Sequence, residues 1–464
     1  MGVRTSGVYC RPVCPARTPR RDRCVFFGHA AEAEQEGFRA CLRCRPELAP
    51  GSGPMDAVPR MVSAAAARIE AGALNQASVE VLASALGVTG RHLRRAVVAG
   101  LGITPVALAQ TRRLALATQL LHDTDLPLGE VALAAGFRSL RRFNALFRAR
   151  FGRPPSALRR RLGGVPAGGG PGVGSVTLRL DYRPPLDWPA LLEFLSARCT
   201  AGVEEVTDGA WRRTVWLGRQ TGWVEVTADP VRPALRARVS LSLAGALMPL
   251  TARLRALFDL DARPAAVAAH LGRDPLLRAS LRRHPGLRVP GAFDGFEAAL
   301  RVVLGQQVTV RAATTVAGRL AAALGEPIRT PFPALDRLAP TPQSVAEAGE
   351  GRIAALGMPG ARARTLGALS RAVAGGDLTL ERHAGPEALE ALRALPGVGD
   401  WTAQVVAMRA LGDPDAFPAG DLGVLRALGA ASPRQAEARA ERWRPWRAYA
   451  AVHLWHLPHR GKGR

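Results

Sequence analysis

The chain has 464 residues, about two to four domains by length, and carries 63 Lys and Arg against 38 Asp and Glu, a net charge of +25. A hydrophobic fraction of 47% excludes an intrinsically disordered chain, and the lack of a long apolar run or of an N-terminal signal segment excludes membrane and secreted proteins. We therefore expect a soluble, cytoplasmic protein whose excess positive charge binds a polyanion, with nucleic acid as the default partner.

Two stretches rich in Gly and Pro divide the chain, at residues 46–59 and 163–174. The second has the composition of a flexible linker. The segments that they separate differ in cysteine content, charge and hydrophobic period, which predicts a multidomain, mainly α protein. Its predicted parts are a cysteine module, a basic helical domain, the linker, an antiparallel β subdomain and a helical body, with the bounds 1–50, 60–162, 163–174, 175–247 and 248–458.

Five of the six cysteines lie in the first 44 residues. Three residues separate Cys10 from Cys14, and two separate Cys41 from Cys44. Pairs of thiolates at these spacings close tetrahedral Zn²⁺ sites, so we expect one Zn²⁺ per chain. Between the pairs, the segment 24–39 predicts a short strand followed by a short helix. A purely architectural zinc clip is the usual interpretation of four such cysteines.

The strings VRTSGVYCRPVCPARTP and EGFRACLRCRPE, however, resemble the N-terminal zinc domain of the Ada adaptive-response family. The resemblance implies that Cys10 is a nucleophile as well as a ligand, and that it takes a methyl group irreversibly from a methyl phosphotriester in DNA. A zinc-bound thiolate stays deprotonated at neutral pH, and the methylated phosphate is neutral, so the negative site does not repel it. Arg17 and Arg43 match positions where the family contacts phosphates.

The segment departs from that family at two points. A strand and a helix precede the first cysteine in the family, whereas here Cys10 is the tenth residue, which indicates a mis-called start or a truncated domain. Cys24 is an additional thiol without a role in the family.

The segment 60–161 carries 16 Arg and five acidic residues, a net charge of +11. The apolar spacing at 79–88 predicts a helix that ends in a Gly turn, and a second helix follows at 90–98, which is helix–turn–helix spacing. The pattern recurs at 128–150, and a helix at 111–122 would join the two copies. A basic amphipathic bundle is the alternative interpretation of either copy alone.

This segment closely resembles the AraC-type DNA-binding domain, including its closing string FGRPPSALRR. The resemblance makes the helices at 90–98 and 139–150 the recognition helices. Arginine favours guanine edges but also contacts phosphates, so base specificity stays open. The arginines expected to contact DNA are Arg91, Arg94, Arg95, Arg138, Arg141 and Arg142.

From Ser175 the hydrophobic period changes to two, since Val176, Leu178, Leu180 and Tyr182 alternate with polar residues. Further strands are expected at 215–217, 223–226 and 235–241. This pattern predicts an antiparallel sheet packed on helices, and helices dominate from about Met248.

The string LPGVGDWTA, residues 395–403, lies between two helical runs, 386–394 and 401–410. Its glycines, Gly397 and Gly399, allow a tight turn whose backbone N–H groups face outward at a helix N-terminus. Such a turn is an anion site that suits a DNA phosphate. This pattern predicts a helix–hairpin–helix element.

About twenty residues further on, Asp421 follows Gly420 in the string FPAGDL. An isolated Asp at such a place is usually a helix N-cap. A carboxylate at this distance after the hairpin is, however, the signature of helix–hairpin–helix base-excision glycosylases, and the combined spacing favours a catalytic role.

The whole of 176–457 resembles the AlkA-type 3-methyladenine DNA glycosylase II family, through the strings YRPPLDW, HPGLRVPGAFDGFEAALRVVLGQQVTV, LGMPGARA and AERWRPWRAYAAVHLW. The resemblance implies an α+β fold, in which a small antiparallel subdomain joins a two-part helical body with the active cleft between. It also implies a monovalent cation bound at the hairpin by the backbone carbonyls of Arg393, Leu395 and Val398.

The expected chemistry is simple, because an alkylated purine carries a positive charge and leaves without a general acid. Asp421 would stabilise oxocarbenium character at the sugar and guide water. The base must be flipped out of the duplex into a pocket, where aromatic faces bind a cation. Phe194, Trp401 and Trp455 match the family's pocket positions, although each alone is more often a core residue.

Three positions depart from the family's pattern. Val405 and Leu422 replace two pocket tyrosines, and Gln307 replaces the apolar residue that wedges into the DNA gap. Relatives that also cleave the strand place a Schiff-base lysine where this chain has Trp401, and the only lysine here is Lys462 in the tail. The sequence therefore predicts a monofunctional glycosylase.

We thus expect a glycosylase for alkylated bases, fused to a transcriptional regulator that methylation of Cys10 switches on. The expected partners are double-stranded DNA and RNA polymerase, with no membrane, and the expected cofactors are Zn²⁺ and the hairpin cation, with no organic cofactor. The alternatives are a transcription activator with a degenerate glycosylase-like domain, and a DNA-binding scaffold without chemistry. Asp421 with an intact hairpin favours the first hypothesis.

Overall fold

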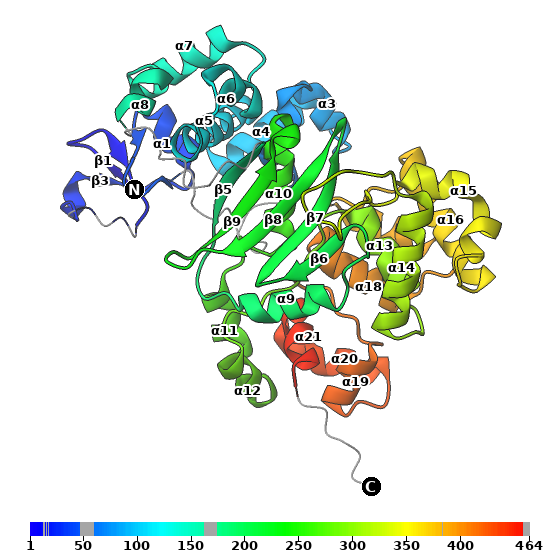
Figure 1. The fold of residues 1–464 in the computed structure, drawn as a ribbon. Helices are drawn as coiled ribbons and strands as arrows, with labels where there is room; N and C mark the ends of the chain where they lie inside the picture. The colour runs from blue at the N-terminus through cyan, green and yellow to red at the C-terminus, as the bar shows by residue number, and fades with distance from the viewer. Residues whose placement is uncertain are drawn as a thin grey trace.

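The computed structural model describes residues 1–12, 14, 16, 18–46, 60–161, 174–382 and 384–457. A central antiparallel sheet lies between a group of N-terminal helices and a larger C-terminal helical body (Figure 1). Of the predicted linker 163–174, only Gly174 lies in the described part. No helix in these ranges is long and apolar enough to cross a membrane.

The N-terminal module is built from strands of two residues. They are β1 (Gly2–Val3), β2 (Val8–Tyr9), β3 (Cys24–Val25) and β4 (Arg39–Ala40), in the order β3-β1-β2-β4. β1 pairs antiparallel with both neighbours, and β2 pairs parallel with β4. The expected helix is shorter than predicted: α1 (Ala30–Gln35) ends early because Gly37 takes a left-handed conformation with φ +83°.

The helical domain holds two helix–turn–helix units. Its helices are α2 (Arg60–Glu70), α3 (Val79–Ser84), α4 (Gly90–Leu101), α5 (Pro105–Asp123), α6 (Leu128–Ala134), α7 (Leu140–Phe151) and α8 (Pro155–Arg161). α5 begins earlier than its apolar spacing predicted, because Thr104 caps its first turn and Pro105 suits that position. In the second unit Gly136 has φ +84°, and a Cβ there would lie 2.3 Å from the Asn75 side chain, so the turn requires glycine.

Alternation of buried and exposed residues builds the central sheet. Its strands are β5 (Ser175–Asp181), β6 (Glu204–Thr207), β7 (Ala210–Leu217), β8 (Gln220–Ala228) and β9 (Ala234–Ser240), all antiparallel, in the order β5-β9-β8-β7-β6. Two elements of this subdomain were not predicted, the edge strand β6 and helix α9 (Trp188–Ser196). β6 is half-buried along its length and shows no clear period, and α9 has only two polar residues, Glu193 and Ser196, to mark its exposed face.

Helices make up the rest of the chain, as predicted. They are α10 (Leu247–Leu257), α11 (Pro264–Leu271), α12 (Pro275–Arg283), α13 (Gly295–Leu304), α14 (Val310–Leu324), α15 (Pro342–Ala354), α16 (Gly360–Gly375), α17 (Pro386–Arg393), α18 (Asp400–Val406), α19 (Leu422–Leu428), α20 (Pro433–Ala440) and α21 (Arg447–Trp455). A π-helical turn, η5 (Ala407–Leu411), extends α18. The hairpin therefore joins α17 to α18.

The second helix–turn–helix unit shares its hydrophobic core with the central sheet. Phe143 and Phe147 of α7 belong to the same buried cluster as Leu178 of β5 and Trp211 of β7. A polar contact crosses the same boundary, since the Gln119 side chain donates a hydrogen bond to the backbone carbonyl of β5 at 3.0 Å. The second unit is therefore packed directly onto the subdomain that follows it.

A buried carboxylate joins the N-terminal module to the helical domain. Glu34 of α1 is 7% exposed and accepts hydrogen bonds from the Tyr9 hydroxyl at 2.9 Å and the Thr111 hydroxyl at 2.7 Å. The Arg150 guanidinium lies 3.1 Å from the same carboxylate. Burial raises the pKa of Glu34, and Arg150 opposes that shift. One acidic side chain thus contacts both α5 and α7.

Ion pairs complete the contacts between the parts. Arg11 of the module forms an ion pair with Asp181 of β5 at 2.9 Å. Arg68 of α2 forms an ion pair with Glu381 at 3.0 Å. A cavity of about 680 Å³ lies where the three parts meet. Six of its lining arginines pair with carboxylates: Arg68, Arg112, Arg179, Arg253, Arg255 and Arg382. Its charge is therefore largely compensated.

We predict that Phe147→Ala lowers the free energy of unfolding by about 3–5 kcal/mol, because it leaves a void in the core shared by α7 and the sheet. Urea unfolding followed by circular dichroism measures this change. Leu140→Ala is the control, since Leu140 is 47% exposed on the same helix and its loss should cost less than about 0.5 kcal/mol. Equal effects of the two substitutions would contradict the shared core.

Candidate functional site

Asp421 lies at the start of α19, between two tryptophan side chains. Its Oδ1 accepts hydrogen bonds from the backbone N–H groups of Gly423 at 2.9 Å and Val424 at 3.1 Å, so it caps the helix. The indole N–H of Trp455 donates to Oδ1 at 2.9 Å, and that of Trp401 donates to Oδ2 at 3.2 Å. Asp421 is therefore an N-cap and is also fixed by both of its aromatic neighbours.

Phe194 completes the aromatic group around this carboxylate. Its ring lies nearly parallel to that of Trp455, with an interplanar angle of 16° and centroids 6.3 Å apart. Phe194 comes from α9, Trp401 from α18 and Trp455 from α21, and all three are half-buried. The structure thus brings the three predicted pocket aromatics together around Asp421.

Sequence reasoning missed a group of three arginines, two of which lie over the Phe194 ring. They are Arg198, which follows α9, Arg301 on α13 and Arg409 in the π-helical turn. Arg409 donates hydrogen bonds to the backbone carbonyls of Pro290 at 3.0 Å and Gly291 at 3.3 Å. The signal was present in the spacing Phe194-xxx-Arg198, which places an arginine one helical turn after the pocket phenylalanine.

The hairpin between α17 and α18 has the geometry of a phosphate site. Gly397 has φ +78°, and a Cβ there would lie 2.1 Å from the Thr365 hydroxyl oxygen, so only glycine fits. Gly399 provides no side-chain cap for α18, which leaves the first N–H groups of that helix for an anion. Gln306 holds the turn in place, because its amide donates to the Gly397 carbonyl and the Thr402 hydroxyl, both at 2.9 Å.

The carbonyls predicted to bind a monovalent cation lie along this turn. The Leu395 carbonyl accepts a hydrogen bond from the Val398 N–H at 3.2 Å. Arg393 pairs through its side chain with Asp400 at 2.6 Å, which joins the two ends of the hairpin. Cation binding here stays a prediction.

The three positions that depart from the family's pattern lie in different surroundings. Gln307 is exposed in the turn between α13 and α14 and has a left-handed backbone with φ +54°. Leu422 directly follows Asp421 and is 67% exposed, whereas Val405 is buried in the core of the helical body. Gln307 and Leu422 are thus available to a bound ligand, and Val405 serves packing.

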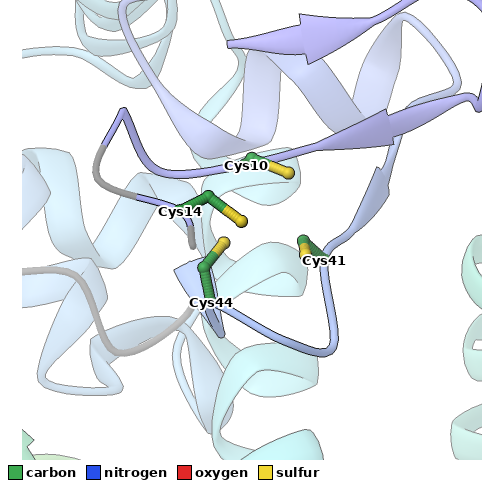
Figure 2. A group of neighbouring side chains, drawn as sticks. All are labelled: Cys10, Cys14, Cys41 and Cys44. Carbon is green, nitrogen blue, oxygen red and sulfur yellow. The ribbon is translucent and has the colours of Figure 1, made fainter. Parts of the chain in front are cut away.

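The four predicted zinc ligands converge in the N-terminal module. The Sγ atoms of Cys10, Cys14, Cys41 and Cys44 all lie within 4.8 Å of one another, and Figure 2 shows them pointing into a common space. A tetrahedral Zn²⁺ with bonds of about 2.3 Å fits such a set. Burial, followed by the neighbouring thiols, raises the pKa of Cys10. Since thiolates this close repel one another, a cation suits the cluster.

Backbone contacts hold these cysteines. The N–H groups of Cys10 and Cys41 donate to the carbonyls of Met1 and Tyr9 at 2.8 and 3.0 Å, so the small sheet positions two of the ligands. The Arg11 N–H donates to the Cys44 Sγ at 3.3 Å, a contact that stabilises a thiolate. Arg43 is exposed beside the cluster, whereas Arg17 lies outside the described residues.

The arginines predicted to read DNA are exposed on the recognition helices. Arg91, Arg94 and Arg95 project from α4, Arg141 and Arg142 lie in the first turn of α7, and Arg138 lies in the turn just before that helix. Arg94 pairs with Glu80 of α3, which ties the two helices of the first unit together. The other exposed guanidinium groups leave both recognition helices strongly positive.

Comparison with known proteins finds four families along the chain. Four family models match in order: the metal-binding domain of Ada at 1–47, a helix-turn-helix domain at 82–161, the AlkA N-terminal domain at 177–294, and the HhH-GPD superfamily of base-excision DNA repair proteins at 300–447.

Individual relatives share this similarity. A probable bifunctional transcriptional activator/DNA repair enzyme AlkA of Mycobacterium tuberculosis is 44% identical over 460 residues, covering 98% of this chain and 92% of the relative. DNA-3-methyladenine glycosylase 2 of Escherichia coli is 36% identical over 278 residues, 60% of this chain and 96% of that protein. A solved 3-methyladenine DNA glycosylase from Archaeoglobus fulgidus, 22% identical, superposes with a TM-score of 0.52 over 60% of this chain and 96% of its own, and shows the fold.

The hairpin, the carboxylate that follows it and the antiparallel sheet define the C-terminal part as a base-excision repair protein of the HhH-GPD superfamily. The Ada-type metal-binding module and the AraC-type helix–turn–helix domain precede it in the same chain. The chain belongs to the family of bifunctional transcriptional activator/DNA repair enzymes of the AlkA type.

We predict that the purified chain holds one Zn²⁺ and that Cys44→Ser loses most of it, because the site needs all four thiolates. Inductively coupled plasma mass spectrometry measures the metal content. Cys24→Ser is the matched control, since Cys24 is a cysteine of the same module outside the cluster, and it should keep its zinc. A wild-type chain without zinc would refute the metal site.

Proposed function

We propose that the chain excises alkylated bases, 3-methyladenine among them, from duplex DNA by hydrolysing the N-glycosidic bond, and that its first two domains form a methylation-responsive transcriptional regulator. The arrangement of Asp421 carries the first part of this proposal. The carboxylate is fixed by the indole N–H groups of Trp401 and Trp455, next to the parallel rings of Phe194 and Trp455.

The aromatic group offers a place for a flipped base. A base stacked between two rings needs about 6.8 Å between them, because each stacking distance is about 3.4 Å. The ring centroids of Phe194 and Trp455 lie 6.3 Å apart, which is close to this value. A small separation of the rings would therefore admit a base between them. The hairpin supports this step, because the N-terminus of α18 provides N–H groups for a phosphate of the same strand.

The reaction then follows from charge. The bond between C1′ and the base nitrogen breaks with its electron pair on the base, which neutralises a cationic purine. Positive charge develops on the sugar, and the ionised Asp421 stabilises it. Water adds to C1′ and its proton passes to Asp421 or to solvent. No lysine stands at the position of Trp401, so no Schiff base forms and the strand stays intact.

The cysteine cluster supports a second activity, methyl transfer to Cys10. The residues would hold Zn²⁺, which when bound keeps the thiolates ionised. The Cys10 Sγ attacks the methyl carbon of a methyl phosphotriester, an S–C bond forms, the C–O bond breaks, and a phosphodiester anion leaves. Cys10 is half-buried and so retains access to solvent, and exposed Arg43 lies near for a phosphate.

Methylation removes one negative charge from this cluster and so favours its binding to DNA. The exposed arginines of α4 and α7 would then read a promoter and recruit RNA polymerase. A monovalent cation at the carbonyls of Arg393, Leu395 and Val398 would support the hairpin. In the alternative, an activator with an inactive glycosylase domain, Gln307 and Leu422 would explain the loss of activity.

We predict that the wild-type chain releases 3-methyladenine from methylated duplex DNA and that Asp421→Asn slows release on the order of a hundredfold to a thousandfold, because the neutral amide cannot stabilise the cationic sugar. Chromatography of the released bases measures the rate. Borohydride added to the reaction should trap no covalent protein–DNA adduct.

Asp274→Asn is the matched control for this substitution. Asp274 also caps a helix, with its Oδ1 accepting from the Leu276 N–H at 2.9 Å, and its Oδ2 accepts from the indole N–H of Trp443 at 2.8 Å. It has the same two structural contacts as Asp421 but lies outside the aromatic group, so base release should be unchanged. Equal loss in both variants would indicate a structural effect, and no release by wild type would favour the activator alternative.

We predict that incubation with DNA that carries a methyl phosphotriester adds one methyl group to Cys10, because it is the thiolate that the family's chemistry uses. Peptide mass spectrometry locates the modification. Cys24→Ser should be methylated at Cys10 to the same extent as wild type. A zinc-loaded chain that stays unmodified, or is modified at another cysteine, would contradict this role.

A further inference from the structure

Two guanidinium groups lie over the Phe194 ring, and a third, that of Arg301, interacts electrostatically with both of them. The Arg198 guanidinium lies 3.7 Å from the ring centroid, and its Nη1 donates to the Phe194 carbonyl at 3.1 Å. The Arg409 guanidinium lies 5.0 Å from the same centroid. Arg301 donates to two threonine hydroxyls at 3.1 Å. In the described ranges, none of the three has a carboxylate within 4.0 Å.

These charges act on one another and on the site. Burial lowers the pKa of Arg198 to about 10 and that of Arg409 to about 9. The next cause is in each case another arginine, Arg301 for Arg198 and Arg198 for Arg409, whereas Asp421 opposes the shift at Arg198. Arg198 and Arg409 therefore stay protonated at neutral pH, and Arg198 is close enough to Asp421 to interact with its carboxylate.

The surrounding acidic groups do not cancel this charge. Glu204 is the carboxylate that opposes the shift at Arg409, but it is itself paired with Arg213 at 3.0 Å. Arg213 also binds Glu297 at 2.9 Å, so the nearby carboxylates are shared with another cation. Apart from Asp421, the region beside the Phe194 ring is positive.

Such a region treats charged and neutral bases differently. An aromatic face attracts a cation through its quadrupole, and a face that already holds a guanidinium offers less to a cationic base. Direct repulsion between like charges adds to this effect where water is excluded. A neutral lesion base, in contrast, receives the electron pair of the glycosidic bond and leaves with negative charge, which a nearby cation stabilises.

We propose that Arg198, supported by Arg301 and Arg409, sets the lesion preference of this site and favours neutral lesion bases over cationic ones. The inference rests on the proposed glycosylase function and adds a residue that determines specificity. For a neutral base, the C1′–N bond breaks with both electrons on the base nitrogen, the water oxygen bonds to C1′, and the water proton ends on the base. The guanidinium lowers the energy of the anion that exists before this proton arrives.

The test is a ratio of two rates, measured in single turnover with enzyme in excess. One duplex carries a single hypoxanthine, a neutral purine, and the other carries 7-methylguanine, a cationic purine. Arg198→Gln removes the charge and keeps an N–H donor for the Phe194 carbonyl. We expect it to lower the neutral-to-cationic ratio on the order of tenfold, through slower hypoxanthine release. Arg198→Lys keeps the charge and should stay within about threefold of the wild-type ratio.

A second variant separates the effect of positive charge near the site from the effect of packing against the Phe194 ring. Arg301→Gln removes a charge without touching the ring contact, and should shift the ratio in the same direction. Arg212→Gln is the control, because Arg212 lies 4.6 Å from the Phe332 centroid and pairs with Glu225, a comparable ring contact with its own carboxylate.

The outcomes are distinct. If Arg198→Gln slows release equally from both duplexes and lowers the melting temperature of the protein, Arg198 only supports Phe194. An unchanged ratio of the two rates in both Arg198→Gln and Arg301→Gln would overturn the proposal. If wild type releases neither base, the proposed function itself fails. If wild type releases both and the ratio does not respond, only the inference about Arg198 fails.

Discussion

Four N–H donors converge on one carboxylate, and the geometry of the glycosylase site depends on that convergence. Two donors belong to the first turn of α19, and two are indole groups on α18 and α21. Asp421 therefore cannot move without breaking bonds to three helices. This matters because the expected reaction needs no proton donor for the base, only a negative charge at a fixed place beside the sugar. The hairpin precedes α18, so that helix links the predicted phosphate site to the carboxylate through the indole of Trp401.

Local patterns in the sequence predicted the order of the parts, most of their helices and the residues of both sites. The cysteine spacing, the doubled helix–turn–helix pattern and the string LPGVGDWTA each encode a short-range geometry, and short-range geometry is what periodicity reports. Asp421 was predicted from its distance to the hairpin. The same pattern indicated a helix N-cap, which the structure shows, and the catalytic role of Asp421 stays a prediction.

The features that sequence reasoning missed depend on contacts between distant segments. Helix α9 has only nine residues, of which Glu193 and Ser196 alone are polar, so its narrow exposed face gives a weak signal in the sequence. The cluster of Arg198, Arg301 and Arg409 joins three segments more than a hundred residues apart in the chain, and apart from the spacing between Phe194 and Arg198 an arginine-rich sequence gives no reason to single them out. The shared core of α7 and the sheet is likewise invisible before the chain folds.

That shared core constrains how a regulator and a repair enzyme work in one chain. The N-terminal module contacts α5 and α7 through Glu34, and α5 in turn contacts β5 of the sheet, while α6 contacts the 3-10 turn at Leu241–Ala246 that follows β9. Arg11, next to Cys10, the proposed methyl acceptor, pairs with Asp181 of β5. A change of charge at the cysteine cluster therefore acts on Arg11, whose side chain already forms an ion pair with the repair domain. The positive charge of +25 is accordingly divided: arginines in the contacts between the parts, such as Arg68, are paired with acids, whereas those on the recognition helices and near Phe194 are largely unpaired. On the recognition helices, DNA phosphates would supply the negative charge.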